Sequence, residues 1–99
     1  MKLDAELLWI IQRAHAVTID RCLRLPQATK MTGLPSASWW KCVKEGTAPS
    51  SISLGPRTIA WRESEIQAWI DANTYASRRK RKIDMKLFIV ALTANKKET

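Results

Sequence analysis

The stretch from Leu25 to Gly46 constrains the fold of this chain more than any other part of it. It reads LPQATKMTGLPSASWWKCVKEG and holds two short helical patterns, separated by the segment from Thr32 to Pro35. A connection this short that contains glycine and proline fits only a tight turn between helices packed at a steep angle. The stretch therefore predicts a helix-turn-helix.

The first of these helices is predicted from Pro26 to about Met31. Proline suits the first helical position, because a backbone N–H there has no partner within the helix. Gly33 can take the positive φ that closes a helix. Ala28 and Met31 are predicted to face inward. Gln27 and Lys30 are left on the outer face. If the motif binds DNA, we expect them to lie near its phosphates.

The second helix is predicted from Ser36, as its capping residue, to Glu45, and it stops at the following glycine. At about 100° per residue, Trp39, Cys42 and Val43 share an inner face. Lysines on the opposite face are usually only solvated, but on a helix of this kind they also suit a DNA groove. The predicted contacts are Ser36, Ala37, Ser38, Lys41 and Lys44, with Trp40 on the flank.

A hairpin is predicted directly after the second helix. Ser51 to Leu54 and Thr58 to Trp61 are short strand patterns on either side of the segment from Gly55 to Arg57, and a Gly-Pro turn between such patterns is typical of a hairpin. A hairpin in this place is the wing of a winged helix, and its arginines can reach phosphates or an adjacent minor groove. The predicted wing contacts are Arg57 at the tip, Thr58 directly after it, and Arg62 at the base.

The N-terminal residues 3–17 carry an apolar stripe at helical spacing, which predicts an amphipathic helix. We expect this helix to dock on the rest of the domain, with a dimer contact as the sharper alternative. His15 beside the stripe is expected to be a surface or packed residue, and Thr18 to Leu25 predicts a short strand or an extended lead-in. The stripe consists of Leu3, Leu7, Ile10, Ala14 and Val17, widened by Leu8 and Ile11.

A further helix is predicted after the hairpin. Glu63 and Glu65 occupy its first turn, where carboxylates complement the positive end of the helix dipole. Large aromatic side chains supply much of the core of a small domain. The residues predicted to pack are Ile66, Trp69 and Ile70 of this helix with Trp39 and Trp61, whereas Trp40 is left as a candidate contact.

The positive charge is concentrated at the C-terminal end. The chain has a net charge of +8, and residues 74–99 hold eight basic and two acidic side chains, which is +6 of that total. The basic run is either solvated or makes non-specific phosphate contacts. For the apolar segment from Met85 to Leu92 we favour a helix over a strand, packed on residues 3–17 or on a second subunit. The basic run consists of Arg78, Arg79, Lys80, Arg81 and Lys82.

Length and composition exclude several classes of protein. A chain of 99 residues is expected to make one domain with an accessory element. Its apolar runs are far below the roughly 18 residues of a membrane span, and the acidic N-terminal segment does not fit a secretory signal. We therefore expect a cytoplasmic protein that has no membrane partner.

The sequence also argues against metal, cofactor and enzyme chemistry. Cys22, Cys42 and His15 are the only cysteines and histidine, too few for a zinc site. Both thiols are expected to be reduced, with Cys42 as a small core filler. A nucleophile beside a base, paired carboxylates and a phosphate-binding glycine loop are lacking, so neither an enzyme nor a cofactor is expected.

These patterns predict a mainly α fold with a small β-hairpin wing. The expected organisation is an amphipathic N-terminal helix in residues 1–20, a winged helix-turn-helix DNA-binding domain in residues 21–73, and a basic and apolar extension in residues 74–99.

From about Arg21 to Ala72, the chain resembles the AlpA family of prophage regulatory proteins, small winged-helix modules similar to MerR-like and excisionase-like DNA-binding domains. The resemblance is carried by RLPQATKMTGL, WKCVKEGTAP and SLGPRTIAWRESEIQAWI in this order. The basic residue of the family's second helix is matched by Lys41. Ser36 stands where the family usually has arginine, and serine cannot make the bidentate contact of arginine with guanine. The wing region matches at Gly55, Pro56, Arg57, Trp61, Ser64, Glu65 and Trp69.

The resemblance implies a protein that binds double-stranded DNA in one of two roles. The first, which we prefer, is a sequence-specific transcriptional regulator of phage or prophage genes. The second is an excisionase-like recombination directionality factor that acts with an integrase. A binding site in a promoter favours the regulator, and one within a recombination site favours the excisionase. An alternative from a different class is a protein-interaction module whose basic tail meets an acidic partner.

Overall fold

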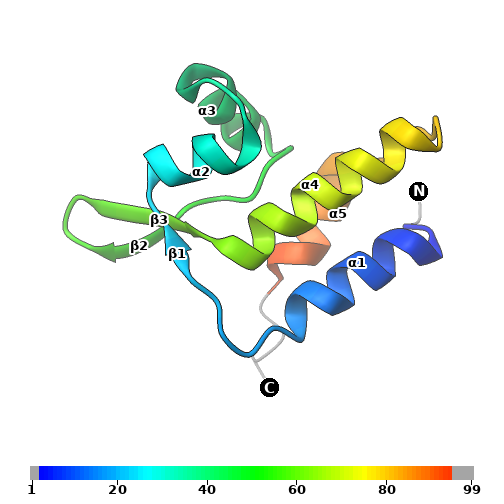
Figure 1. The fold of residues 1–99 in the computed structure, drawn as a ribbon, viewed down its shortest axis with the longest axis horizontal. Helices are drawn as coiled ribbons and strands as arrows, with labels where there is room; N and C mark the ends of the chain where they lie inside the picture. Colours follow the sequence, from blue (N-terminus) through cyan, green and yellow to red (C-terminus); the bar gives the residue numbers. More distant parts are fainter. Residues whose placement is uncertain (1–2, 95–99) are drawn as a thin grey trace.

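The computed structural model describes residues 3–94, which form five helices around a small three-stranded sheet (Figure 1). This arrangement confirms the predicted fold class, a mainly α winged helix-turn-helix. No helix within these residues is both long and apolar enough to cross a membrane. In chain order the elements are α1 (Ala5–His15), β1 (Cys22–Leu23), α2 (Leu25–Thr32), α3 (Ser36–Glu45), β2 (Ile52–Gly55), β3 (Thr58–Arg62), α4 (Glu63–Arg78) and α5 (Met85–Thr93).

The helix-turn-helix consists of α2 and α3. α2 begins at Leu25, one residue before the predicted start, so Pro26 is its second residue and not its first. The earlier start is stabilised by Gln27, whose side-chain Oε1 accepts a hydrogen bond from the backbone N–H of Arg24 at 2.9 Å. This bond satisfies one of the donors left free at a helix N-terminus. Gly33 ends α2 with a φ of 79°, as predicted.

The start of α3 differs from the prediction. Ser36 is its first helical residue and not its cap, and no side chain caps the helix within residues 3–94. The cap position belongs to Pro35, whose carbonyl accepts a hydrogen bond from the Trp39 N–H at 3.0 Å. Because the proline ring fixes φ near the value that a cap residue needs, the helical ladder begins one residue earlier. The end at Glu45, closed by Gly46 with a φ of 82°, is as predicted.

The predicted hairpin is present as β2 and β3, and a third strand completes the sheet in the order β1-β3-β2. β1, within the segment predicted as a strand or a lead-in, pairs antiparallel with β3 and places Leu23 opposite Trp61. β2 pairs with the other edge of β3, with Ile52 opposite Ala60. The central strand therefore joins the wing to the segment that enters the helix-turn-helix.

A first core lies between the helix-turn-helix, the sheet and α4. Trp39 and Trp61 have no exposed surface (0 %). The Trp39 ring packs edge to face on Trp61 and Trp69, with centroids 5.7 Å and 5.3 Å apart, a favourable geometry for aromatic pairs. The indole N–H groups of Trp61 and Trp69 donate to the carbonyls of Pro49 at 3.0 Å and Thr47 at 2.7 Å. The predicted packing of these three tryptophans is confirmed.

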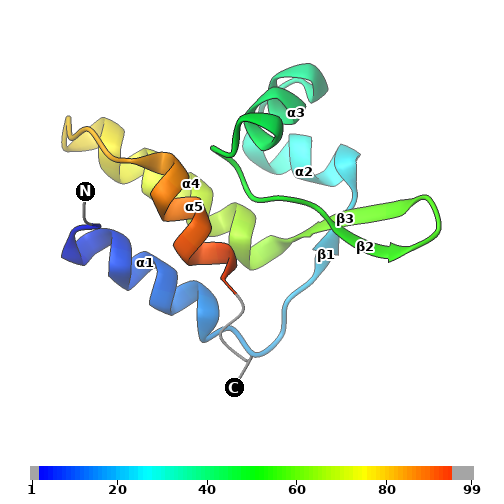
Figure 2. The same cartoon turned by 180° about the vertical axis from the view of Figure 1, so that it is seen from behind.

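A second core lies between α1, α4 and α5 (Figure 2). The helix favoured for Met85 to Leu92 is present as α5, and docking is confirmed for both terminal segments. His15 is a packed residue, because its Nε2 lies 2.7 Å from the carbonyl oxygen of Leu92 in α5. The buried members are Leu7, Ile10 and Ile11 of α1, Ala68 and Ala72 of α4, and Phe88, Ile89 and Leu92 of α5.

Two residues assigned to the apolar stripe of α1 are not buried. Val17 is 44 % exposed because α1 ends at His15, so Val17 no longer follows the helical face. Leu8 is 45 % exposed, since α4 and α5 cover only the side of α1 that carries Leu7 and Ile11. The buried stripe is therefore narrower than predicted, and a homodimer through these helices stays a prediction.

α4 belongs to both cores and spans 16 residues. Ile66 is buried in the first core and Ala72 in the second, while Trp69 packs against both. The helix continues through residues 73 and 74, where the sequence suggested a division between the domain and its extension. A single helix thus connects the winged module to the accessory helices.

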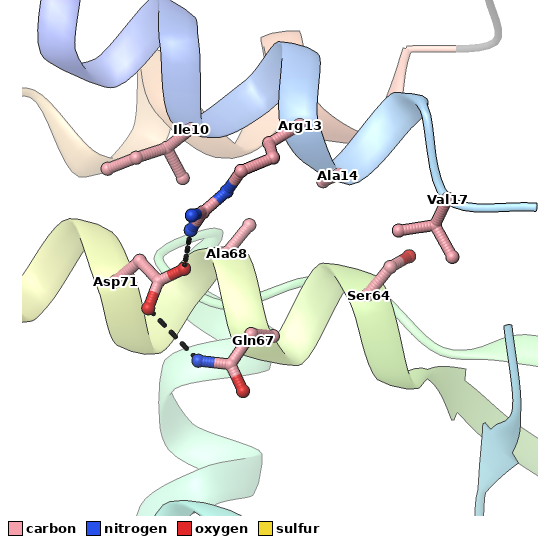
Figure 3. Close-up of a pocket in the computed structure, with 8 residues that line it drawn as sticks. All are labelled: Ile10, Arg13, Ala14, Val17, Ser64, Gln67, Ala68 and Asp71. Carbon is pink, nitrogen blue, oxygen red and sulfur yellow. Dashed lines mark hydrogen bonds and ion pairs between the residues drawn. The ribbon is translucent and has the colours of Figure 1, made fainter.

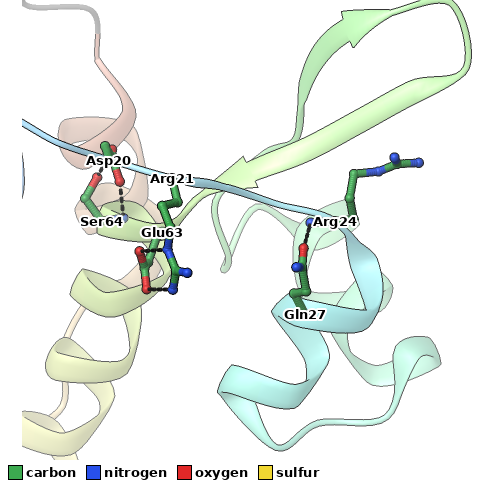
Figure 4. A network of polar contacts seen from close by, with 6 residues as sticks. All are labelled: Asp20, Arg21, Arg24, Gln27, Glu63 and Ser64. Carbon is green, nitrogen blue, oxygen red and sulfur yellow. Dashed lines mark hydrogen bonds and ion pairs between the residues drawn. The ribbon is translucent and has the colours of Figure 1, made fainter.

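The segment before β1 is tied to the start of α4 by side-chain bonds (Figure 4). Asp20 accepts from the Ser64 backbone N–H at 2.9 Å and from the Ser64 hydroxyl at 2.6 Å, and Arg62 Nε donates to it at 2.9 Å. The cap residue Arg62 provides no side-chain cap, so Asp20 caps α4 from 44 residues away. Arg21 adds a two-bonded ion pair with Glu63, both bonds 2.9 Å long.

Asp20→Asn tests this cap. Burial raises the pKa of the Asp20 carboxyl, but hydrogen bonds from Ser64 and Arg62 outweigh it and hold the pKa below its usual value. The substitution keeps the size of the side chain and should lower the free energy of unfolding at pH 7 by about 1 to 2 kcal/mol. Urea titration measures the loss.

The pH dependence separates this role from simple packing. A carboxyl with a depressed folded-state pKa stabilises above its unfolded pKa of about 4, and the contribution is lost as the pH falls through the folded value. The difference between wild type and Asp20→Asn should be constant above about pH 5 and shrink below about pH 4. The exposed Glu45→Gln is the control, and a difference that does not change with pH contradicts the assignment.

Candidate nucleic-acid interface

The outer face of α3 is open to solvent. Trp39 is fully buried, while Cys42 and Val43 are half-buried and pack on the first core. The predicted division of α3 into an inner and an outer face is confirmed, and the outer face presents a polar surface with two lysines. The exposed residues, all predicted as contacts, are Ser36, Ala37, Ser38, Trp40, Lys41 and Lys44.

The N-terminus of α3 presents backbone donors. Since no side chain of the described residues caps the helix, the N–H groups of its first turn are available to an external acceptor. The helix dipole adds positive potential at the same place, which favours an anion such as phosphate. The exposed hydroxyls of Ser36 and Ser38 supply further donors.

Trp40 presents aromatic surface at the flank of α3. It is 38 % exposed, and its ring lies edge-on to Trp61, with the centroids 5.3 Å apart and the planes at 63°. The buried indole of Trp61 therefore fixes the orientation of Trp40. A fixed aromatic side chain lies next to Lys41 on the exposed side of the helix.

The hairpin carries a cation at its tip. Arg57 is exposed and takes a left-handed φ of 58° in the turn, and no carboxylate of residues 3–94 forms an ion pair with it. The Thr58 hydroxyl donates to the Pro56 carbonyl at 3.1 Å, so this predicted contact also stabilises the turn. Arg57 is the wing residue whose charge is available to a partner.

Two other predicted contacts have partners within the protein. The Arg62 Nε donates to Asp20 at 2.9 Å, and the Arg62 side chain is 49 % exposed. Gln27 uses its Oε1 to bond the Arg24 N–H. Lys30, in contrast, is exposed on α2 without an ion pair among the described residues. The DNA contacts of all three stay predictions.

Comparison with known proteins identifies the family. The sequence pattern of the family described as "Prophage CP4-57 regulatory protein (AlpA)" matches residues 21–74, more than half of the chain. The chain belongs to the AlpA family of prophage regulatory proteins. It is also similar to "Uncharacterized protein ORF88" of Enterobacteria phage P4, with 33 % identity over 64 residues, or 65 % of this chain and 72 % of the phage protein. No solved structure is significantly similar to it.

The AlpA match falls on one part of the fold. It begins before β1 and ends inside α4, so it contains the helix-turn-helix and the hairpin. The helices α1 and α5 lie outside it. The winged module is thus the part of this chain that the AlpA pattern covers, together with Ala68 and Ala72 of the second core.

The basic run from Arg78 to Lys82 lies apart from the wing. It follows the C-terminal end of α4, at the end of the molecule opposite to the β2–β3 hairpin, as both ribbon views show (Figures 1 and 2). All of its side chains are exposed. A duplex that also met the hairpin would have to extend along the whole length of the molecule. The phosphate contacts of Arg78, Arg79, Lys80, Arg81 and Lys82 stay a prediction.

The two carboxyls in the first turn of α4 differ from each other. The hydrogen bonds from Arg21 hold the pKa of Glu63 below its usual value, as suits a carboxylate at a helix N-terminus. Burial raises the pKa of Glu65 to about 7 against the opposing effect of Arg62. Glu65 lines a cavity of about 630 Å³ between the wing base and the accessory helices. Both carboxyls lie in the first turn of α4, as predicted, but burial disfavours the charged form of Glu65.

The roles of Asp20 and Arg21 were missed by the sequence interpretation. Their partners Ser64 and Glu63 lie 44 and 42 residues further along the chain. No periodic pattern connects positions so far apart. The available signal was the position before Glu63, where arginine replaces the serine, threonine, aspartate or asparagine usual in a helix cap.

Glu65→Gln tests the environment below the wing. Because the pKa of Glu65 is raised in the folded state from 4.5 to about 7, the folded protein holds a proton that the unfolded chain releases over this range. The free energy of unfolding must then fall as the pH rises from about 5 to 7. Urea unfolding at pH 5 and pH 8 should show this decrease in wild type and a smaller one in Glu65→Gln. The free energy of unfolding of Glu45→Gln should decrease by as much as that of wild type. Equal decreases in all three proteins would contradict the burial of the Glu65 carboxyl.

Proposed function

We propose that this AlpA protein is a DNA-binding transcriptional regulator of phage genes. In this proposal α3 enters the major groove and the β2–β3 hairpin meets the flanking backbone or minor groove. The observation that carries it is the combination of two open cationic features, the lysine face of α3 and Arg57 at the hairpin tip, which forms no ion pair within residues 3–94. Its membership of a prophage regulatory family supports the regulatory role.

The first core supports the proposal by fixing the two features relative to each other. Trp39 of α3 contacts Trp61 of β3 with centroids 5.7 Å apart, and Trp40 contacts the same ring at 5.3 Å. Helix and hairpin therefore approach a partner as one body. A preorganised surface loses little conformational entropy on binding.

The residues of α3 suggest how the groove is read. Serine, which stands at position 36, can bond either a donor or an acceptor on a base and so discriminates weakly. Ala37 offers a methyl group, which suits the methyl of thymine. Lys41 is the strongest candidate for a guanine contact, because lysine can donate to the acceptors of guanine in the major groove. We therefore expect modest base specificity from α3 and an important contribution from Arg57.

Lys41→Ala and Arg57→Ala test the proposed surface. Each should weaken binding to duplex DNA by roughly 1 to 3 kcal/mol, or about 5- to 150-fold in Kd. Lys86→Ala removes the same charge from an exposed position of α5 and should bind within about twofold of wild type. Fluorescence anisotropy with a labelled duplex from the region around the gene measures all three.

The comparison with Lys86→Ala separates local contacts from net charge. If all three variants lose affinity equally, total charge and not the α3 and hairpin surface determines binding. If Lys41→Ala and Arg57→Ala both bind as wild type does while their circular dichroism spectra are unchanged, the proposal is wrong.

A further inference from the structure

A groove runs between α1 and α4 on the side of the molecule that the AlpA match only partly covers. The Arg13–Asp71 ion pair, 2.8 Å long, divides it into cavities of about 150 Å³ and 360 Å³. Figure 3 shows the smaller part, in which Arg13 of α1 reaches Asp71 of α4 and Gln67 donates to the same carboxylate at 3.0 Å. The larger part extends toward the C-terminal end of α4.

One wall of the larger cavity is an exposed tryptophan held in place. Trp9 is 52 % exposed and lines the cavity, so it presents aromatic surface to a partner. The Arg13 guanidinium lies 4.4 Å from the centroid of its ring, within the range of a cation–π contact. Since Arg13 is itself fixed by Asp71, the indole has a stable orientation without being buried.

The other wall combines an aromatic ring with arginines. The Tyr75 hydroxyl donates to Asp4 at 2.7 Å, which anchors its ring between α1 and α4. Arg79 lies over this ring at 5.9 Å, and both Arg78 and Arg79 line the cavity. The chain then continues into Lys80, Arg81 and Lys82, all exposed and without an ion pair among residues 3–94.

We propose that this groove binds an acidic segment of a partner protein. An aromatic or large aliphatic side chain of the segment would insert between Trp9 and Tyr75, and its carboxylates would meet the basic run that begins at Arg78. The charge complementarity is strong, because five consecutive cations flank an aromatic-lined cavity. Aromatic and arginine side chains are those enriched at the centres of protein interfaces.

Two observations favour a protein over a second DNA duplex. The larger cavity of about 360 Å³ fits one side chain, whereas a duplex presents a broad rod of phosphates. The basic run lies at the end opposite to the hairpin, so a partner can be held here while α3 and the wing remain free. The inference does not depend on DNA binding by the winged module.

A synthetic peptide tests this surface directly. The probe is a fluorescein-labelled, glutamate-rich peptide with one central phenylalanine, titrated with the full-length protein in an anisotropy assay. Two matched peptides serve as controls, one with alanine in place of phenylalanine and one with lysines in place of the glutamates. We expect the probe to bind at least about tenfold more tightly than either control.

Variants of the protein then locate the site. Trp9→Ala should weaken binding of the probe by about tenfold or more, and Trp9→Phe should restore part of the loss. The double variant Arg78→Gln/Arg79→Gln, with both changes at exposed positions, should weaken binding of the probe to a similar extent, because it removes two positive charges. Lys86→Ala, which removes one exposed cation elsewhere, should bind the probe as wild type does.

Several outcomes would overturn the proposal. Equal binding of the probe and the alanine peptide, or no loss in Trp9→Ala, would mean that the groove is not used. If Trp9→Ala fails to fold, the Arg78→Gln and Arg79→Gln variant decides alone. If neutralising residues 78–82 leaves the probe affinity unchanged but flattens the salt dependence of DNA affinity, the basic run contacts phosphates and the proposal is wrong.

Discussion

The position of Trp39 decides how the two candidate contact elements are held together. Its ring is fully buried and touches Trp61 of β3 and Trp69 of α4 edge to face. Its indole N–H has no hydrogen-bond partner within residues 3–94, and an unpaired buried donor costs roughly 1 to 3 kcal/mol. Burial of the large ring and its aromatic contacts offset this cost. Trp39 therefore holds α3 against the sheet and α4 through packing and not through a hydrogen bond of its own indole.

α4 extends this constraint to the rest of the chain. Trp69 packs against both cores, and the helix continues from the Asp20 cap at Ser64 to the basic run at Arg78. The winged module shared with AlpA proteins and the accessory groove are consequently connected by one continuous helix. A partner bound in the groove would have a defined position relative to anything bound by α3.

The sequence predicted those features that depend on local periodicity. The inward position of Trp39 and the outward position of Lys41 follow from the turn angle of a helix, and both are found in the structure. Tertiary contacts explain the differences. Leu8 is exposed because no described element covers its side of α1. Arg62 already donates a hydrogen bond to Asp20, which comes from a distant segment of the chain. Which charges are free to bind a partner can be judged only after such ion pairs are known.

Footprinting of the purified protein on the DNA around its own gene shows whether α3 and the hairpin contact DNA together. Dimethyl sulfate methylates guanine in the major groove and adenine in the minor groove, so protection from it reports both. We expect protected major-groove positions where α3 inserts, flanked on one side by protected minor-groove or backbone positions where the hairpin tip lies. Backbone protection without protected groove positions, or no footprint from the folded protein, would contradict this mode of binding.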